Sequence, residues 1–257
     1  MRMIKSLTLI AFVLALAACA AQSTHEKAAK HWTTDQLSKA LAASTRPQAD
    51  RDRDADRKPA ELIAFFGVEP GMTVVDVIAA GGYMTDVLAV AVGPNGKVYA
   101  QNPPVLLRMR DGVYDKAITE RLANDRLHNV VRVDADLPPA QIPPGSVDVA
   151  ITAMNFHDVD HINPDAGVAF MKAVYTMLKP GGVFGVTDHV GADGADNVKL
   201  HRVPKHRAIE AAQAAGFVVE ADSDLLAHPA DDHTKVVFDP TLRGRTDQFT
   251  LRLRKPK

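Results

Sequence analysis

The chain has 257 residues, with 30 lysines and arginines against 31 acidic residues, and its formal net charge at pH 7 is −1. Beyond an N-terminal segment, this length is sufficient for one α/β domain with a sizeable core. The balanced charge and the lack of a recurring basic face exclude nucleic acid as an expected partner. Aromatic residues make up 5% of the chain, which also disfavours a base-stacking surface.

Residues 1–18 are typical of a targeting segment rather than of a folded domain. Arg2 and Lys5 precede the apolar stretch Leu7–Ala18, which is too short to span a bilayer comfortably. Cys19 is the only cysteine of the chain, so no intrachain disulfide bond is expected.

The residues around Cys19 resemble the signal of bacterial lipoproteins, in which a cysteine after small residues becomes lipidated and N-terminal. The resemblance implies membrane attachment through a lipid on Cys19 and a periplasm-facing location in the bacterial cell envelope. Ala20, where an aspartate is absent, favours the outer membrane. The alternatives are an ordinary signal peptide cleaved near Ala18 and an uncleaved anchor.

Residues 19–58 are interpreted as a tether followed by an N-terminal helical and charged arm. Thr34–Ala43 is predicted to form a short helix with Thr33 or Thr34 as its cap. The run Arg46–Lys58 alternates charge densely. This is typical either of a solvated linker or helix face, or of an arm of arginines folded over the mouth of an active site.

Residues 59–257 alternate β-branched runs with helical patterns, which predicts a mainly parallel sheet covered by helices on both faces. The predicted strands are Thr73–Ile78, Lys97–Gln101, Val130–Val133, Val147–Ala153, Val183–Val186, Phe217–Val219 and a final alternating run, Phe249–Arg254. The predicted helices are Ala60–Phe66, one between Gly82 and Gly93, one from Asn163 to Leu178, and Pro204–Ala215.

The segment Met72–Asn102 is a strand–turn–helix–strand unit suited to a nucleotide-like ligand. Its first strand ends in small residues and Gly81-Gly82, and Gly93-Pro94 ends the helix that follows. Small residues at such a turn allow a ligand to approach backbone N–H groups at a helix N-terminus.

The order and spacing of several such segments resemble the class I S-adenosylmethionine-dependent methyltransferases over nearly all of Pro59–Lys257. A group of predicted bacterial envelope methyltransferases is similar as well. The segments are Val74-Val75-Asp76-Val77, Gly82, Gly93-Pro94-Asn95-Gly96, Asp134, Ser146-Val147-Asp148-Val149, Asn155-Phe156-His157-Asp158 and Leu178-Lys179-Pro180-Gly181-Gly182.

The resemblance implies a doubly wound, Rossmann-like sheet of seven strands with the last strand antiparallel. It also implies S-adenosylmethionine as cofactor and methyl transfer to an unknown small molecule. The positions that match the family's cofactor site are Asp76, Ile78, Ala80, Gly82, Tyr83, Asn102, Asp134 and Asn155.

The cofactor turn departs from the family pattern, because two of its three glycine positions hold Ile78 and Ala80 and only Gly82 remains. A Cβ at these positions crowds the backbone, and a positive φ is unfavourable for a branched residue. Asn102 stands where an acidic residue normally binds the ribose hydroxyls, so charge-assisted bonds worth ~1–2 kcal/mol are lost.

Ionisable residues follow the fourth and fifth strands, whose carboxyl ends meet at one edge of the sheet. His157, Asp158 and His189 are the candidate catalytic residues, and either histidine is a candidate general base. Asp158, Asp188 and Asn155 form an alternative set of metal ligands, while no metal is the first expectation. His157 and His161 are four residues apart, as on one helix face.

Further polar clusters are His201-Arg202 and Asp231-Asp232-His233. The irregular segment Leu225–Thr246 is interpreted either as a lid over the site or as a solvated connection.

Three functions remain open: an envelope methyltransferase, an inactive methyltransferase-like lipoprotein that binds another ligand, and a metal-dependent activity in the same cleft. The sequence leaves the methyl acceptor and the oligomeric state undetermined.

Overall fold

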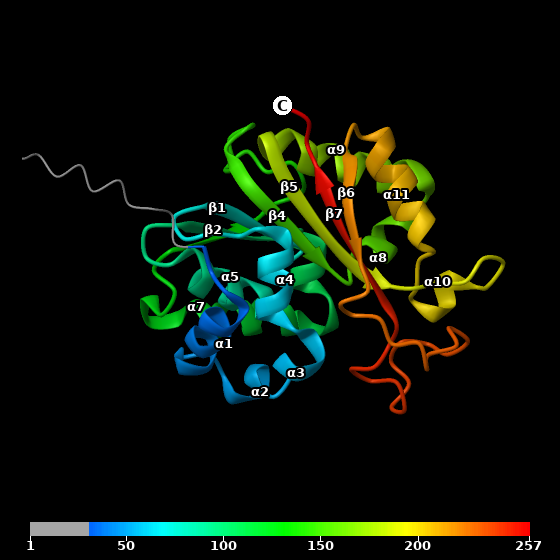
Figure 1. Cartoon of the computed structure of the whole chain (residues 1–257), viewed down its shortest axis with the longest axis horizontal. Coiled ribbons are helices and arrows are strands. Elements are labelled where there is room, and N and C mark those ends of the chain that lie inside the picture. Colours follow the sequence, from blue (N-terminus) through cyan, green and yellow to red (C-terminus); the bar gives the residue numbers. More distant parts are fainter. Residues whose placement is uncertain (1–30) are drawn as a thin grey trace, which may run out of the picture.

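The computed structural model describes residues 31–257, which form one mixed sheet with helices on both faces (Figure 1). The predicted signal peptide and the predicted lipidation of Cys19 lie outside these residues. The strands are β1 (Thr73–Val77), β2 (Lys97–Asn102), β3 (Val130–Asp134), β4 (Val147–Ala153), β5 (Leu178–His189), β6 (Val218–Ser223) and β7 (Gln248–Arg254).

The sheet has seven strands in the order β3-β2-β1-β4-β5-β7-β6. Strands β1 to β5 are mutually parallel, and β7 runs antiparallel to both β5 and β6. The predicted fold class is therefore confirmed, including the antiparallel last strand. The direction of winding reverses between β1 and β4, so a crevice for ligands is expected beyond the carboxyl ends of these two strands.

The helices of the described chain are α1 (Thr34–Ala43), α2 (Gln48–Arg51), α3 (Asp54–Arg57), α4 (Pro59–Phe66), α5 (Tyr83–Val92), α6 (Pro104–Arg108), α7 (Val113–Leu122), α8 (Phe156–Asp160), α9 (Pro164–Met177), α10 (Asn197–Leu200) and α11 (Lys205–Ala214). Side chains of β1 alternate between two cores because successive residues of a strand point to opposite faces. Val74 packs in the core with α1, α4 and α5. Val75 and Val77 pack in the core with α9 and α11.

Some elements differ from the sequence prediction. The prediction lacked α6, α7, α8 and α10; α7 buries only Ile118, so its apolar pattern is weak. The last helix before β5 ends as expected, but β5 begins at Leu178 rather than at Val183. Leu178 already pairs with Val147, and an irregularity follows before Val149 pairs with Val183. Among the described residues, no helix is both long enough and apolar enough to cross a membrane.

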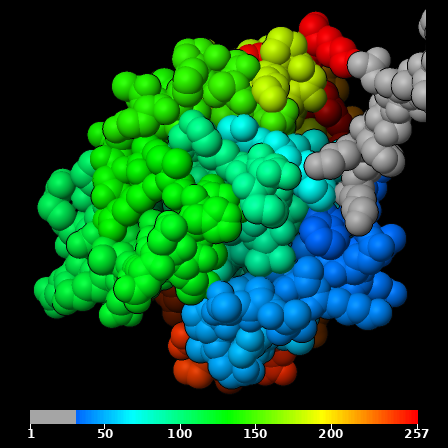
Figure 2. All heavy atoms as spheres, turned by 90° about the vertical axis from the view of Figure 1, so that its left-hand side faces the viewer, coloured from blue at the N-terminus to red at the C-terminus, as the bar shows by residue number. Residues whose placement is uncertain are grey.

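The N-terminal helix α1 belongs to the folded unit. Thr33, one of the two caps that the sequence predicted, caps it in a capping box with Gln36. Leu37 and Leu41 are buried against α4 and α5. The charged run that follows forms α2 and α3, and Figure 2 shows these blue helices lying against the cyan and green segments.

Because Leu41 is 2% exposed, Leu41→Ala leaves a cavity under α1 and is expected to lower the free energy of unfolding by about 2–4 kcal/mol. Chemical denaturation measures this loss. Lys39→Ala, on the exposed side of the same helix, is the matched control and should change stability by less than about 0.5 kcal/mol. Equal stability of both variants would show that α1 does not fold with the sheet.

Candidate functional site

The turn after β1 keeps an unusual backbone at each position where the family resemblance calls for glycine. Ile78, Ala80 and Gly82 have φ angles of 58°, 49° and 83°. Only glycine adopts this left-handed region without strain, which costs other residues roughly 1–2 kcal/mol each. The loss of two glycines has therefore left the shape of the turn intact, at an energetic cost.

Two amide side chains from the end of β2 hold this turn. Asn102 accepts a hydrogen bond from Ala80 N at 2.7 Å and donates one to Ala80 O at 3.1 Å. Gln101 accepts from Ile78 N at 3.1 Å and donates to Ala135 O. Both side chains are fully buried. The two strained residues are thus the two whose backbone N–H groups the amides bind.

This geometry bears on the predicted ribose contact of Asn102. Its side chain is 0% exposed and both polar groups bind Ala80, so contact with a ribose requires these bonds to be exchanged. Asp76, at 3% exposure, is likewise bonded within the protein and accepts a hydrogen bond from Thr85 Oγ1 at 2.5 Å. It fixes the first turn of α5 to β1.

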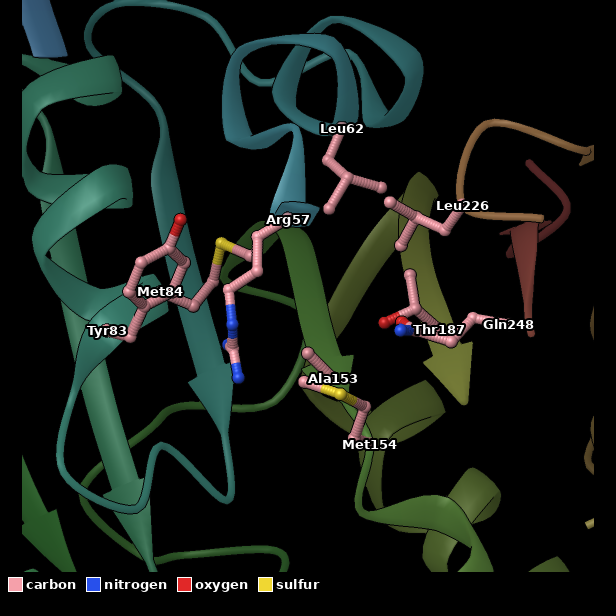
Figure 3. A pocket seen from close by; sticks show the side chains of 9 residues that line it. All are labelled: Arg57, Leu62, Tyr83, Met84, Ala153, Met154, Thr187, Leu226 and Gln248. Carbon is pink, nitrogen blue, oxygen red and sulfur yellow. The ribbon is translucent and has the colours of Figure 1, made fainter. Parts of the chain in front are cut away.

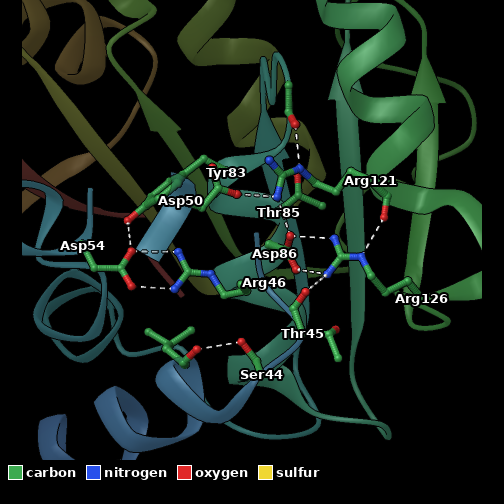
Figure 4. A network of polar contacts seen from close by, with 12 residues as sticks. Ser44, Thr45, Arg46, Asp50, Asp54, Tyr83, Thr85, Asp86, Arg121 and Arg126 are labelled. Atoms are coloured by element: carbon green, nitrogen blue, oxygen red, sulfur yellow. Dashed lines mark hydrogen bonds and ion pairs between the residues drawn. The ribbon is translucent and has the colours of Figure 1, made fainter. Parts of the chain in front are cut away.

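The charged arm reaches the turn through a network of ion pairs (Figure 4). Arg46 forms a bidentate pair with Asp54 at 2.6 and 2.8 Å, and the hydroxyl of Tyr83 donates to Asp54 at 2.6 Å. From α7, Arg121 donates to Gly81 O at 2.7 Å and to Asp50 at 2.6 Å. The arm, the turn and α7 are thereby joined.

A second part of the network surrounds Asp86 on α5. Its side chain is 0% exposed and receives both Arg121 and Arg126. Removing one partner of a buried pair leaves an uncompensated charge, which is strongly destabilising. The network therefore fixes how α7 and the arm sit on the turn.

A pocket lies beside the turn, at the carboxyl ends of the central strands (Figure 3). Its free volume is about 10 Å³, room for roughly one water molecule, so a nucleoside-sized ligand requires the lining side chains to move apart. Tyr83 and Met84 from α5 line one side, and Ala153 and Met154 after β4 line another. The remaining lining residues are Arg57, Leu62, Thr187, Leu226 and Gln248.

Arg57 supplies the one formal positive charge in the lining of this pocket. Figure 3 shows its side chain passing between Tyr83 and Met154. The guanidinium lies 4.6 Å from the centre of the Tyr83 ring, and among the described residues it has no hydrogen-bonded or ion-paired partner. Burial, helped by Arg53, lowers the pKa of Arg57 to about 10, which still leaves it charged at neutral pH.

Two other arginines also lie over the Tyr83 ring, Arg46 at 5.3 Å and Arg53 at 5.2 Å from its centre. The sequence of the run Arg46–Lys58 is interpreted either as a solvated segment or as a folded arm of arginines. The structure shows a folded arm that lies beside a pocket. The segment between β6 and β7 also reaches the pocket through Leu226, and Lys58 donates to Leu225 O at 2.8 Å.

The loops after β4 and β5 are neighbours, as predicted. His157 Nδ1 lies 2.7 Å from Asp188 Oδ1, and His157 N donates to Asp188 Oδ2 at 2.8 Å. His157 Nε2 lies 3.3 Å from Asp158 Oδ1. Although burial opposes it, the two carboxylates raise the pKa of His157 to about 10, so without a ligand it is an imidazolium ion at neutral pH.

His189 is in the opposite electrostatic state. It is 9% exposed, and its Nδ1 lies 2.9 Å from Thr246 Oγ1. Burial lowers the pKa of His189 to about 4, with His157, Arg202 and Arg57 adding to the effect and Asp188 opposing it. His189 is therefore neutral at pH 7. Of the two candidate bases, it is the one with an unprotonated nitrogen in this arrangement.

The other predicted ligand contacts are occupied by protein groups. Asn155 donates to Ile78 O at 3.2 Å and to Ala153 O at 2.9 Å, which ties the end of β4 to the turn. Asp134 binds Arg132 at the end of β3 and is 39% exposed. The roles predicted for these two residues stay predictions.

The alternative metal set of Asp158, Asp188 and Asn155 stays a prediction. Asp188 is occupied by His157 and by the backbone of His189. Within residues 31–257, the cluster with suitably placed ligand atoms is His157, Asp158 and His201.

The residues fit the methionine half of S-adenosylmethionine better than its ribose half. The turn has the backbone shape that the resemblance requires, and the guanidinium of Arg57 suits a carboxylate, while the pocket must widen to admit the aliphatic chain that carries it. Near the ribose position, the bonds of Asn102 to Ala80 close the approach.

No protein-family model matches the chain, and no curated protein matches it by sequence. Solved structures do match. A methyltransferase from Aquifex aeolicus, dependent on S-adenosylmethionine, superposes with a TM-score of 0.59 at 18% identity, over 87% of this chain and 99% of that one. The chain has the class I methyltransferase fold.

Two further structures match over most of the chain. A sarcosine dimethylglycine methyltransferase, so described for Galdieria sulphuraria, has a TM-score of 0.57 at 16% identity, over 79% of this chain and 85% of its own. The [4+2]-cyclase SpnF has a TM-score of 0.58 at 20% identity, over 79% of this chain and 81% of its own. One fold thus carries different chemistries, and the site must decide the function.

Sequence reasoning missed Arg57 and Gln248, and it named His201 only as part of a further polar cluster, without placing it at the site. Arg57 was one charge among many in its run, and only its position over Tyr83 distinguishes it. His201 and Gln248 come from loops and strands distant in sequence. No local sequence spacing indicates that these two residues lie near the site, because the order of the strands in the sheet decides which residues surround them.

Ala80→Gly is expected to stabilise the protein by up to about 1 kcal/mol, because glycine adopts a φ of 49° without strain. Thermal unfolding measures the gain. Ala79→Gly is the matched control: Ala79 is buried beside Ile118, so this change should lower stability. A loss for both variants would contradict the strain assigned to Ala80.

Burial raises the pKa of Asp76 to about 6, with the bonds from Thr85 opposing, so the folded state binds this proton more tightly than the unfolded state does. Stability from this group is present at low pH and falls as pH rises from about 4 to 6. In Asp76→Asn this dependence is removed. The stability difference, variant minus wild type, should shift in the variant's favour by on the order of 2 kcal/mol between pH 4 and pH 7. Denaturant titrations at both pH values measure it, and a pH-independent difference would contradict the raised pKa.

Proposed function

We propose that the chain is an S-adenosylmethionine-dependent methyltransferase that acts on a small molecule. One observation carries the proposal: the turn after β1 keeps three positive φ angles and opens onto a pocket formed by the ends of β4 and β5. The class I methyltransferase fold supports it.

The cofactor supplies an electrophilic methyl group on a sulfonium centre. The protein's part is then to orient the two reactants and to exclude water, which supplies much of the rate in a displacement of this kind. Tyr83, Met84, Met154 and Leu226 provide the apolar walls for this purpose. Arg57 is the binding partner for the carboxylate of the methionine half, by a charge-assisted hydrogen bond.

His189 is the group that accepts a proton from the acceptor. Thr187 lines the pocket, and His189 points to the same face of β5, since residues two apart on a strand share a face. The lowered pKa of His189 keeps it neutral at pH 7. While its Nε2 carries a proton, His157, fixed by Asp188, is placed to stabilise negative charge on the acceptor rather than to take the acceptor's proton.

The proposed location is the periplasm-facing side of the bacterial outer membrane, with attachment through a lipid on Cys19. The support is the sequence pattern before this cysteine. Cell fractionation with and without Cys19→Ser tests it: the variant should move from the membrane to the soluble fraction, and an unchanged distribution would overturn it.

A second candidate is a domain of this fold that binds a ligand without transferring a methyl group. The bonds of Asn102 to Ala80 favour it, because they occupy the ribose position from within the protein. The ligand of such a domain would use the Arg57 pocket alone.

Calorimetry on the purified full-length protein with S-adenosylmethionine and with its demethylated product separates the two candidates. Saturable binding of both supports the methyltransferase, and no heat at millimolar cofactor overturns it. Gly82→Asp is an unsuitable negative control, because a Cβ there would lie 2.7 Å from Ile118 and the φ of 83° would be strained. Loss of binding in that variant would report misfolding.

Arg57→Met is the sharper variant, since it keeps an unbranched apolar stem and removes the charged guanidinium. It should weaken binding of the cofactor and of its product roughly 10-fold or more, the worth of a charge-assisted bond. Arg53→Met removes an exposed arginine that also lies over Tyr83, and it should change binding less than 2-fold. Equal affinity in the two variants would contradict the carboxylate contact of Arg57.

A further inference from the structure

Three ligand atoms converge beside the pocket, from two loops far apart in sequence. Asp158 Oδ1 lies 3.3 Å from His157 Nε2 and 3.6 Å from His201 Nδ1. All three atoms lie within 4.8 Å of one another. Ligand atoms about 2.1 Å from a tetrahedral zinc ion are about 3.4 Å apart, so the two distances already match a coordination sphere.

The nitrogen and oxygen ligand atoms favour some metal ions over others. Two imidazoles and one carboxylate suit zinc and other divalent transition metals, whereas magnesium and calcium prefer sites made of oxygen alone. Three protein ligands are also the number found in catalytic zinc sites, in which a further position stays open. The side chain of Asp158 is 60% exposed and that of His201 is 40% exposed, so the open side faces solvent.

A buried carboxylate orients the first histidine. Asp188 is 0% exposed and lies 2.7 Å from His157 Nδ1, which leaves Nε2 directed at Asp158. Asp188 is itself fixed by the backbone N–H groups of His157 and His189, both at 2.8 Å. A carboxylate on the far nitrogen of a metal-binding histidine is a recurring feature of metal sites, because it sets the tautomer and raises the basicity of the ligand.

The second histidine is held in place by a separate set of contacts. His201 ends α10 with a φ of 54°, a strained conformation for a residue other than glycine. The next residue, Arg202, is fully buried and pairs with Asp231 at 2.9 and 3.0 Å. Arg202 also donates to Val190 O at 3.0 Å, next to the end of β5. The backbone conformation of His201 and the buried contacts of Arg202 together keep His201 near Asp158 of α8.

We propose that His157, Asp158 and His201 bind one divalent transition-metal ion, with zinc as the representative ion. Asp188 is the positioning residue behind His157. The metal site does not rest on the proposed methyl transfer. His157 and Asp158 come shortly after Met154 in the sequence, and Asp188 comes directly after Thr187; both Met154 and Thr187 line the pocket.

The test is metal binding by the purified full-length protein after treatment with a chelator, in the absence of any cofactor. Titration with cobalt(II) should give visible absorption of a low-symmetry, nitrogen- and oxygen-ligated ion that saturates at one equivalent, and zinc should displace it. Calorimetry with zinc gives the affinity directly.

His201→Ala and Asp158→Asn should each weaken zinc binding at least 10-fold, and both change exposed side chains, so the fold is retained. The matched control is His206→Ala. It removes an exposed histidine of the neighbouring helix α11, whose Nδ1 lies 3.6 Å from the carboxylate of Asp193. Zinc affinity should be unchanged in that variant.

The absence of a saturable one-to-one signal in the wild type, or equal losses of zinc affinity in His201→Ala and His206→Ala, would overturn the site. Thermal unfolding of each variant shows whether any loss of binding reflects the ligand or the fold.

Discussion

The rest of the site depends on the turn after β1, a strained backbone that side chains from β2 hold in place. Ile78 and Ala80 stay in the left-handed region because Gln101 and Asn102 bind their N–H groups, and because Arg121 binds the carbonyl of Gly81. Without these bonds the turn would relax, and the start of α5 would move. The positions of Tyr83 and Met84, and hence one wall of the pocket, follow from this constraint.

The same constraint explains why the N-terminal arm is part of the site. Arg121 binds the turn, Asp86 and Asp50 at once, so α7, α5 and α2 are placed relative to one another by a single guanidinium. The arm then brings Arg57 over Tyr83, where it has no carboxylate partner among the described residues. A partly buried guanidinium without an ion-paired carboxylate is available to bind an anionic group. Under the proposed function, the arm as well as the turn therefore decides which ligand the pocket accepts.

On the far side of the pocket, Asp188 has the organising role. It sits at the end of β5, fully buried, and it fixes both the backbone and the ring of His157. His157 and His189 lie with ring centres 5.9 Å apart and are driven to opposite protonation states, one by carboxylates and one by burial. Groups with such divergent pKa values concentrate at functional sites. Asp188 therefore holds both the proposed base, His189, and the proposed metal ligand His157 in place.

The sequence by itself determined the fold: β-branched runs, glycine and proline stops and helix caps predicted every strand, the two-sided helical cover and the cap at Thr33, because these signals are local. It also placed His157, Asp188 and His189 at one edge, since the ends of parallel strands must meet there. Only the tertiary structure decided which partners the polar groups found. Asn102 turned toward Ala80, Arg57 was left unpaired over Tyr83, and His201 met Asp158. These outcomes depend on contacts between segments far apart in the chain, which no local pattern encodes.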